Sequence, residues 1–149
     1  GGPAQADLHQ ALQSVLARCH AAGARILVNS IHPEAWWHEA DGVHLRSQDA
    51  AQLNSRPTLA AGKRVGVSTH NLPELEHARA LDADFAVLGP VLPTASHPGH
   101  PGIGWDNFAQ LNAQAGLPVF ALGGQSAATL AHAQSVGGHG FAGIRGWIT

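Results

Sequence analysis

The sequence is poor in cysteine, in charge and in long apolar runs. Its single cysteine, Cys19, excludes an internal disulfide and favours a reducing compartment. Because Cys19 lies on an apolar helical stripe, we expect it to be a buried structural thiol. Charged residues make up only 12% of the chain and hydrophobic residues 44%, which excludes a disordered chain. No apolar stretch approaches the roughly 20 residues of a membrane span and no signal peptide is evident, so the sequence predicts a cytoplasmic protein.

Length, net charge and histidine content further limit the kinds of protein and of ligand that the sequence allows. The 149 residues suffice for one domain with its own core, and we treat residues 1–149 as that domain. The net charge of −2 gives no reason to expect nucleic acid or a membrane as a partner. Eleven histidines suggest metal binding, but the pairs His32/His38 and His97/His100 lack the partner ligands that a zinc site needs.

Short apolar runs alternate with helical patterns along the whole chain. Three strands open in a similar way, with Ala40-Asp41, Ala83-Asp84 and His139-Gly140. This repeat predicts a parallel sheet with helices outside it. The expected strands are 26–28, 43–45, 65–67, 85–88, 119–122 and 141–144. The expected helices are one carrying Leu8 to Cys19, one at 34–39, a short one capped by Asp49, one from Asn71 to Leu81, one from Trp105 that ends before Gly116, and one capped by Ser126.

Polar residues collect directly after the expected strands. They are Asn29, Ser30, Ser47, Gln48, Asp49, Ser68, His70, Thr94, Ser96, His97, Gly123, Gly124 and Arg145. Several strand ends that converge on one face are typical of a (β/α)8 barrel, whereas a doubly wound open sheet concentrates its ligand contacts at one switch point. We favour a TIM-barrel type of α/β fold with six βα units visible.

The segment from Gly89 to Gly99 is the most informative stretch. An apolar run at 85–88 leads into a loop that is rich in glycine, proline and hydroxyl groups and that contains a histidine. Ligands in α/β proteins bind where such strands end, and small hydrogen-bonding groups on a rigid backbone suit a polyanion or a polar heterocycle. The alternative is an ordinary proline-rich surface turn.

These residues resemble the family of thiamine phosphate synthase and thiazole tautomerase. The resemblance covers nearly the whole chain, and its most specific part is Gly-Pro-Val-Leu-Pro-Thr at 89–94 together with the Gly-Gly pair at 123–124. The other matching segments are 40–45, 66–70, 83–88, 121–122 and 140–145. The chain is most similar to the synthase-like module that follows a Nudix hydrolase domain in some bacterial fusion proteins.

The resemblance implies a (β/α)8 barrel whose first two strands have no counterpart here. The second of them carries the family's Gln-x-Arg-x-Lys contacts to diphosphate. We therefore expect an incomplete barrel or a fragment of a longer chain, with two open apolar edges. A homo-oligomer or a missing N-terminal domain would cover them.

The resemblance also implies a reaction and a set of site residues. The synthase joins hydroxymethylpyrimidine diphosphate to thiazole phosphate and releases diphosphate with the help of Mg²⁺. By this resemblance Asn29 lies near the diphosphate, Asp49 is a metal ligand and Ser68 lies near the pyrimidine and leaving group. Thr94, Ser96 and His97 form the catalytic loop, with His97 in the place of a lysine. Gly123 and Gly124 match the family's backbone cradle for the thiazole phosphate. Arg145 stands where the family usually has a serine, and we expect it to add a charge-assisted contact to that phosphate. We also expect His70 to bind substrate.

Three departures from the family pattern leave other functions open. Ser30 stands where the family has a second metal-binding aspartate, His97 replaces a lysine, and the strand with arginine and lysine is absent. One alternative is a non-catalytic module that binds phosphate ligands, attached to a Nudix hydrolase. Another is an isomerase of the thiazole tautomerase type with His70 or His97 as its general base, although Pro90 occupies the position of the tautomerase's own catalytic histidine.

Overall fold

A single parallel sheet organises the chain. The structure is a computed structural model, and it describes residues 2–93, 99–122, 130–135, 137–138 and 140–142. Six strands lie in the order in which they occur in the chain, from β1 to β6. This sequential order agrees with a barrel-type sheet and excludes the doubly wound alternative, in which the strand order reverses. The strands are β1 (Val28–Asn29), β2 (Gly42–Leu45), β3 (Arg64–Thr69), β4 (Phe85–Leu88), β5 (Val119–Leu122) and β6 (Gly140–Ala142).

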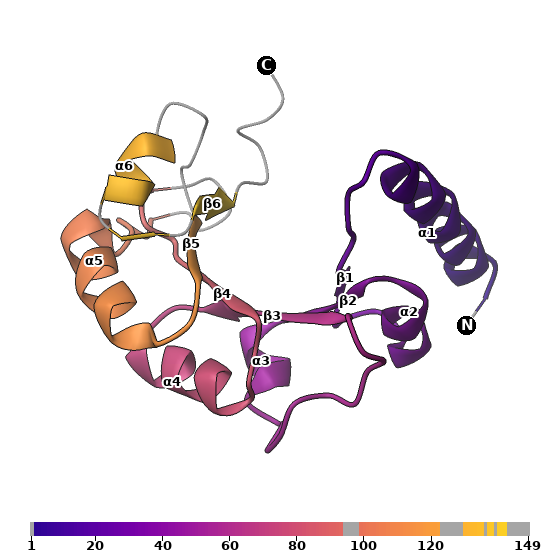
Figure 1. Cartoon of the computed structure of the whole chain (residues 1–149), viewed down its shortest axis with the longest axis horizontal. Coiled ribbons are helices and arrows are strands. Elements are labelled where there is room, and N and C mark those ends of the chain that lie inside the picture. The colour runs from indigo at the N-terminus through magenta and orange to yellow at the C-terminus, as the bar shows by residue number, and fades with distance from the viewer. Residues whose placement is uncertain (1, 94–98, 123–129, 136, 139, 143–149) are drawn as a thin grey trace.

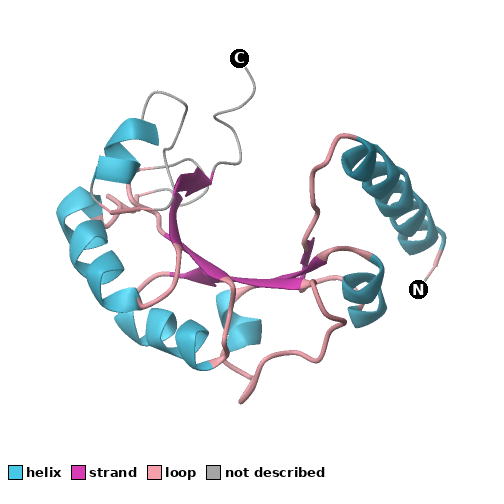
Figure 2. Ribbon diagram, viewed as in Figure 1, coloured by secondary structure: helices cyan, strands magenta, loops and turns pink. Residues whose placement is uncertain are grey.

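The helices lie outside the arc that the sheet forms. Figure 1 shows the strands curving from β1 to β6, with α2 to α6 on the outer side. Figure 2 shows that no described helix or strand crosses the concave inner face. The helices are α1 (Pro3–Ala21), α2 (Glu34–Glu39), α3 (Ser47–Ala50), α4 (Leu72–Ala80), α5 (Gly104–Ala115) and α6 (Leu130–Ser135). No helix in the described part of the chain is both long enough and apolar enough to cross a membrane.

Alternating side chains along each strand divide the sheet into two faces. Val43 and Val65 are fully buried and pack in one cluster with residues of α3 and α4. Leu88 and Val119 belong to a second cluster with Phe108 of α5. Because successive residues of a strand point to opposite faces, the residues between them line the concave side. Those residues are His44, Gly66, Ser68, Phe85, Val87 and Phe120.

Two aspartates explain the Ala-Asp repeat of the sequence. The backbone N–H of Asp84 donates to the carbonyl of Val65, and the Asp84 carboxylate accepts the N–H of the same residue at 2.7 Å. Asp41 makes the same pair of bonds with Ile26, its carboxylate lying 2.8 Å from the Ile26 nitrogen. Each aspartate therefore joins the start of its strand to the preceding strand segment. Arg56 adds an ion pair to Asp84 at 3.0 Å.

Most of the expected elements are present, with three corrections. The first strand is Val28–Asn29 and not 26–28, because Ile26 is already bonded to Asp41. Asp49 does not cap α3: it lies inside that helix, and its side chain turns to other partners. Cys19 is only partly buried. The expected cap at Ser126 lies outside the described residues.

The β1 edge of the sheet is open. Within the described residues β1 pairs only with β2, and β6 only with β5. Leu16 of α1 packs against Val28 and Trp36, whereas Leu8 and Val15 of the same helix are exposed. A groove of about 310 Å³ runs between α1 and β1. The expectation of two open apolar edges stays a prediction.

We expect the Asp84→Ala substitution to destabilise the fold. It would leave the N–H of Val65, a fully buried residue, without its acceptor and would remove the carboxylate that pairs with Arg56. An unsatisfied buried donor costs about 1–3 kcal/mol, so urea unfolding should show a loss of that size. Asp7→Ala, which removes an exposed carboxylate on α1, is the matched control. Equal stability of the two variants would contradict the role of Asp84.

Candidate functional site

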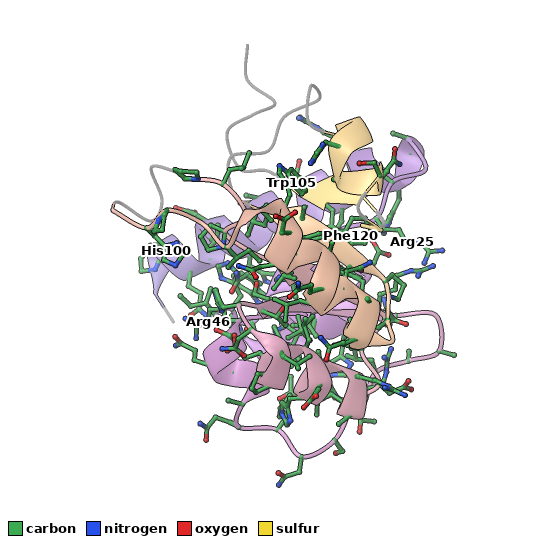
Figure 3. All side chains as sticks on the ribbon, turned by 90° about the vertical axis from the view of Figure 1, so that its left-hand side faces the viewer. Arg25, Arg46, His100, Trp105 and Phe120 are labelled. Atoms are coloured by element: carbon green, nitrogen blue, oxygen red, sulfur yellow. The ribbon has the colours of Figure 1, made fainter. Side chains whose placement is uncertain are left out.

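The carboxyl ends of β1, β2 and β3 bring several polar side chains to one edge of the sheet. Ser30 follows β1, Asp49 lies in the helix after β2, and His70 follows β3. The register places Asn29 opposite His44, so the strand ends are adjacent. Figure 3 shows Arg46, after β2, and His100, after β4, at one end of the molecule, with Arg25 at the other end.

An ion pair occupies the end of β2. The Arg46 Nε donates to Asp49 Oδ2 at 2.6 Å, and Arg46 Nη2 donates to Asp49 Oδ1 at 3.2 Å. The Ser30 hydroxyl donates to Asp49 Oδ2 at 2.6 Å and accepts the backbone N–H of Arg46 at 2.9 Å. Ser30, Arg46 and Asp49 therefore form a closed hydrogen-bonded cluster, which we call the Arg46 cluster.

This pairing holds both side chains in their charged forms. The hydrogen bond from Arg46, with that from Ser30, lowers the pKa of the Asp49 carboxyl below its usual value. The hydrogen bond with Asp49 in turn raises the pKa of the Arg46 guanidinium. Asp49 is thus an ionised carboxylate whose two oxygens are both engaged.

A Mg²⁺ ion does not fit this donor set. Magnesium requires several oxygen ligands at close range, but both Asp49 oxygens already accept hydrogen bonds and a guanidinium lies against them. The second carboxylate that the family resemblance implies is replaced by the Ser30 hydroxyl, which donates its proton to Asp49. Among the described residues no group of three or more His, Cys, Asp or Glu side chains is placed to hold a metal ion.

A second polar pair lies on the concave face. His44 Nε2 and Ser68 Oγ are 2.8 Å apart across neighbouring strands. Burial lowers the pKa of His44, so the imidazole is neutral at pH 7. A Cβ atom at position 66 would lie 2.3 Å from Phe85 Cζ and 2.8 Å from His44 Nδ1, so glycine is needed for this close approach. The Ser68 hydroxyl is therefore held by a rigid, half-buried neutral histidine.

The other expected site residues within the described part of the chain, His70 and Asn29, form hydrogen bonds to residues nearby in the sequence. The backbone N–H of His70 donates to Glu74 Oε1 at 2.8 Å, and His70 Nδ1 lies 2.9 Å from the same oxygen. Asn71 caps α4 by accepting the N–H of Glu74, so the expected cap at this helix is confirmed. Asn29 Oδ1 accepts the N–H of Ile31, which turns the chain after β1.

The start of the Gly-Pro-rich loop is anchored in the sheet. Gly89 and Pro90 are buried and joined by a cis peptide bond. The Val91 N–H donates to the carbonyl of Leu122 at 2.7 Å, and the Ile103 N–H donates to the carbonyl of Pro90 at 2.8 Å. A Cβ at Gly89 would lie 2.2 Å from the Leu122 oxygen, so no side chain fits there. The start of the loop, from Gly89 to Val91, therefore lies against the carboxyl ends of β3 and β5.

Comparisons with known proteins identify the family. The thiamine monophosphate synthase family matches residues 3–147. The thiamine-phosphate synthase of Thermosynechococcus vestitus is 39% identical over 108 residues, which are 72% of this chain and 31% of that protein. A thiamine-phosphate synthase homologue of Aquifex aeolicus is 31% identical and is matched over 93% of this chain and 74% of its own length.

The chain belongs to the thiamine monophosphate synthase family.

A solved structure agrees on the fold. The thiamine phosphate pyrophosphorylase of Pyrococcus furiosus superimposes with a TM-score of 0.72 at 20% identity, over 97% of this chain and 68% of that one. Across the first relatives, however, the chain spans only about a third of their length, from 31% to 36%. The family is thus established, together with a barrel-like α/β fold with a parallel sheet.

The structure tests only part of the expected site. Asn29 and Ser68 lie at the carboxyl ends of β1 and β3, and Asp49 and His70 lie in the segments that follow β2 and β3. Thr94, Ser96, His97, Gly123, Gly124 and Arg145 lie outside the described residues. Sequence reasoning missed Arg46 and His44. Arg46 could have been found, because an arginine directly after a strand and three residues before a candidate metal ligand is placed to pair with it.

We expect His44 to make stability depend on pH in a specific window. Because its folded pKa lies below the unfolded value of about 6.5, the unfolded chain binds an extra proton as the pH falls through that range. The stability present above pH 6.5 should therefore decline toward the folded pKa. His44→Gln should flatten this part of the profile measured by urea unfolding, whereas His38→Gln on exposed α2 should not. Identical slopes for wild type and His44→Gln would contradict the assignment.

Proposed function

We propose that this chain carries out the chemistry of thiamine biosynthesis for which its family is named. The reaction joins hydroxymethylpyrimidine diphosphate to thiazole phosphate and releases diphosphate. The observation that carries the proposal is the family match over residues 3–147, with polar side chains gathered at the carboxyl edge of the sheet. Active sites of barrel enzymes lie at this edge.

The described residues supply hydrogen-bond donors for an anionic substrate. When neutral His44 carries its proton on Nε2, it donates to Ser68 Oγ and leaves the Ser68 hydroxyl free to donate to a diphosphate oxygen. The side chain of Asn29 at the end of β1 uses its Oδ1 atom to accept the N–H of Ile31, and its amide nitrogen is a further possible donor to the ligand. Both groups stabilise negative charge as it develops on the departing diphosphate.

The loop residues complete the proposed site. Thr94, Ser96 and His97 would contact the diphosphate, and Gly123, Gly124 and Arg145 would bind the thiazole phosphate through backbone N–H groups and a guanidinium. The course of the Gly89–Leu92 segment along the carboxyl edge supports the first set. We further propose an eight-stranded barrel in which additional strands cover the β1 edge, since β1 is unpaired on one side within the described residues.

A second candidate is a non-catalytic module that binds phosphate ligands. It is favoured by one observation: the aspartate that the resemblance assigns to Mg²⁺ is already paired with Arg46. Such a module could regulate an attached Nudix hydrolase. No observation on the described residues favours a tautomerase: Pro90 has no titratable group, and His97, one of its two candidate bases, lies outside the described residues.

An assay of product formation tests the proposal. Purified protein with hydroxymethylpyrimidine diphosphate and thiazole phosphate should form thiamine phosphate, detected as its fluorescent oxidation product. Ser68→Ala should lower kcat/KM by about tenfold or more, since a hydrogen bond to a charged group is lost. Ser14→Ala on exposed α1 is the control. Absence of product from the wild-type protein would reject the synthase and, with calorimetric binding of thiazole phosphate, would favour the module.

A further inference from the structure

We propose that the positively charged guanidinium of Arg46 binds the diphosphate or phosphate group of the ligand without a divalent metal. This inference rests on the proposed function for the identity of the ligand. It concerns a residue that the family resemblance does not assign, and it explains why the cluster after β2 does not fit Mg²⁺. The ligand class is a phosphorylated anion with at least two free oxygens.

The guanidinium of Arg46 has N–H donors that do not bind Asp49. Its Nε and Nη2 atoms are bonded to Asp49, whereas no described residue bonds to Nη1. A guanidinium carries five N–H donors in a planar fork, so the edge that faces away from Asp49 can still bind phosphate oxygens. The side chain is 35% exposed, which leaves that edge accessible.

The Arg46 cluster also orients the guanidinium before a ligand arrives. Asp49 holds one edge by two bonds, and Ser30 bonds both to Asp49 and to the backbone of Arg46. Fixing a flexible arginine in advance reduces the conformational entropy that ligand binding must remove.

Charge balance supports the exchange of a metal for an arginine. A divalent cation between two carboxylates forms a neutral group, and so does one guanidinium beside one carboxylate. Ser30 stands where the resemblance implies the second carboxylate, so the loss of one negative charge is matched by the loss of one positive charge. A Mg²⁺ ion at Asp49 would have to displace Arg46 first, since both would bind the same oxygens.

Calorimetric titration with inorganic diphosphate in the presence of EDTA tests this inference. We expect binding without metal. Arg46→Ala should weaken it by about tenfold or more, as expected for a lost charge-assisted bidentate contact. Arg25→Ala removes the same charge at the opposite end of the molecule and should bind as the wild type does (Figure 3). Arg46→Lys, which keeps the charge but not the planar fork, should recover only part of the affinity.

The Asp49→Asn variant tests whether this carboxylate orients Arg46 or binds a metal ion. If Asp49 only holds Arg46 in place, Asp49→Asn should weaken metal-free diphosphate binding, though by less than Arg46→Ala does, because the guanidinium keeps its charge but loses its ionic anchor. If Asp49 is a metal ligand, the same variant should weaken Mg²⁺-dependent binding. Circular dichroism spectra of each variant establish that it is folded.

The outcomes separate this inference from the proposed function. Metal-free binding that depends on Arg46 supports the inference even if no thiamine phosphate is formed. Thiamine phosphate formation that requires Mg²⁺ and is unchanged in Arg46→Ala would support the proposed function and overturn the inference. Diphosphate binding only with Mg²⁺, or none at all, would overturn it as well.

Discussion

The parallel ladder makes the strands β2 to β5 bury one row of side chains under helices and present the other row on the concave face. Val43, Val65 and Leu88 belong to the buried row and make the two larger clusters of the core. His44, Ser68 and Phe85 belong to the other row, one register step away. The polar pair in the sheet is therefore a consequence of the alternation, since the helix-facing positions cannot accept a histidine and a serine without losing core volume.

Aspartate residues lie at both ends of the strands, and they have different partners at the two ends. At the amino ends, Asp41 and Asp84 accept backbone N–H groups of the neighbouring strand segment and thereby join the strands in register. At the carboxyl end, Asp49 accepts side-chain donors from Arg46 and Ser30. Barrel folds in general separate stability and function in this way between the two faces of the barrel.

Much of the fold could be predicted from periodicity. The strands at 85–88 and 119–122 and the helix at 34–39 agree with the structure residue for residue, because apolar runs and helical spacing reflect burial directly. Element ends were less predictable. Ile26 belongs to an apolar run but lies outside β1, since its N–H and carbonyl are used by Asp41, a residue distant in sequence.

The sequence could predict that polar side chains follow the strands, but it did not predict which of these side chains pair with one another. Polar residues after each strand located the edge, and the resemblance supplied roles for Asn29, Asp49 and Ser68. The resemblance led us to interpret Asp49 as a metal ligand, whereas the spacing of Arg46 and Asp49 in the sequence is equally compatible with an ion pair. The decisive partner, Arg46, lies three residues away, and its orientation depends on Ser30 from another strand.

The proposed role of Arg46 would let the family keep its scaffold while the cation at the site changes. A metal ion is recruited from solution and requires several anionic ligands, whereas an arginine belongs to the chain and requires only one carboxylate to orient it. Such an exchange leaves the sheet untouched, because Ser30, Arg46 and Asp49 follow the strands and contribute nothing to the buried clusters. The site's charge can therefore vary independently of the core, and the fold alone does not determine how the phosphorylated ligand is held.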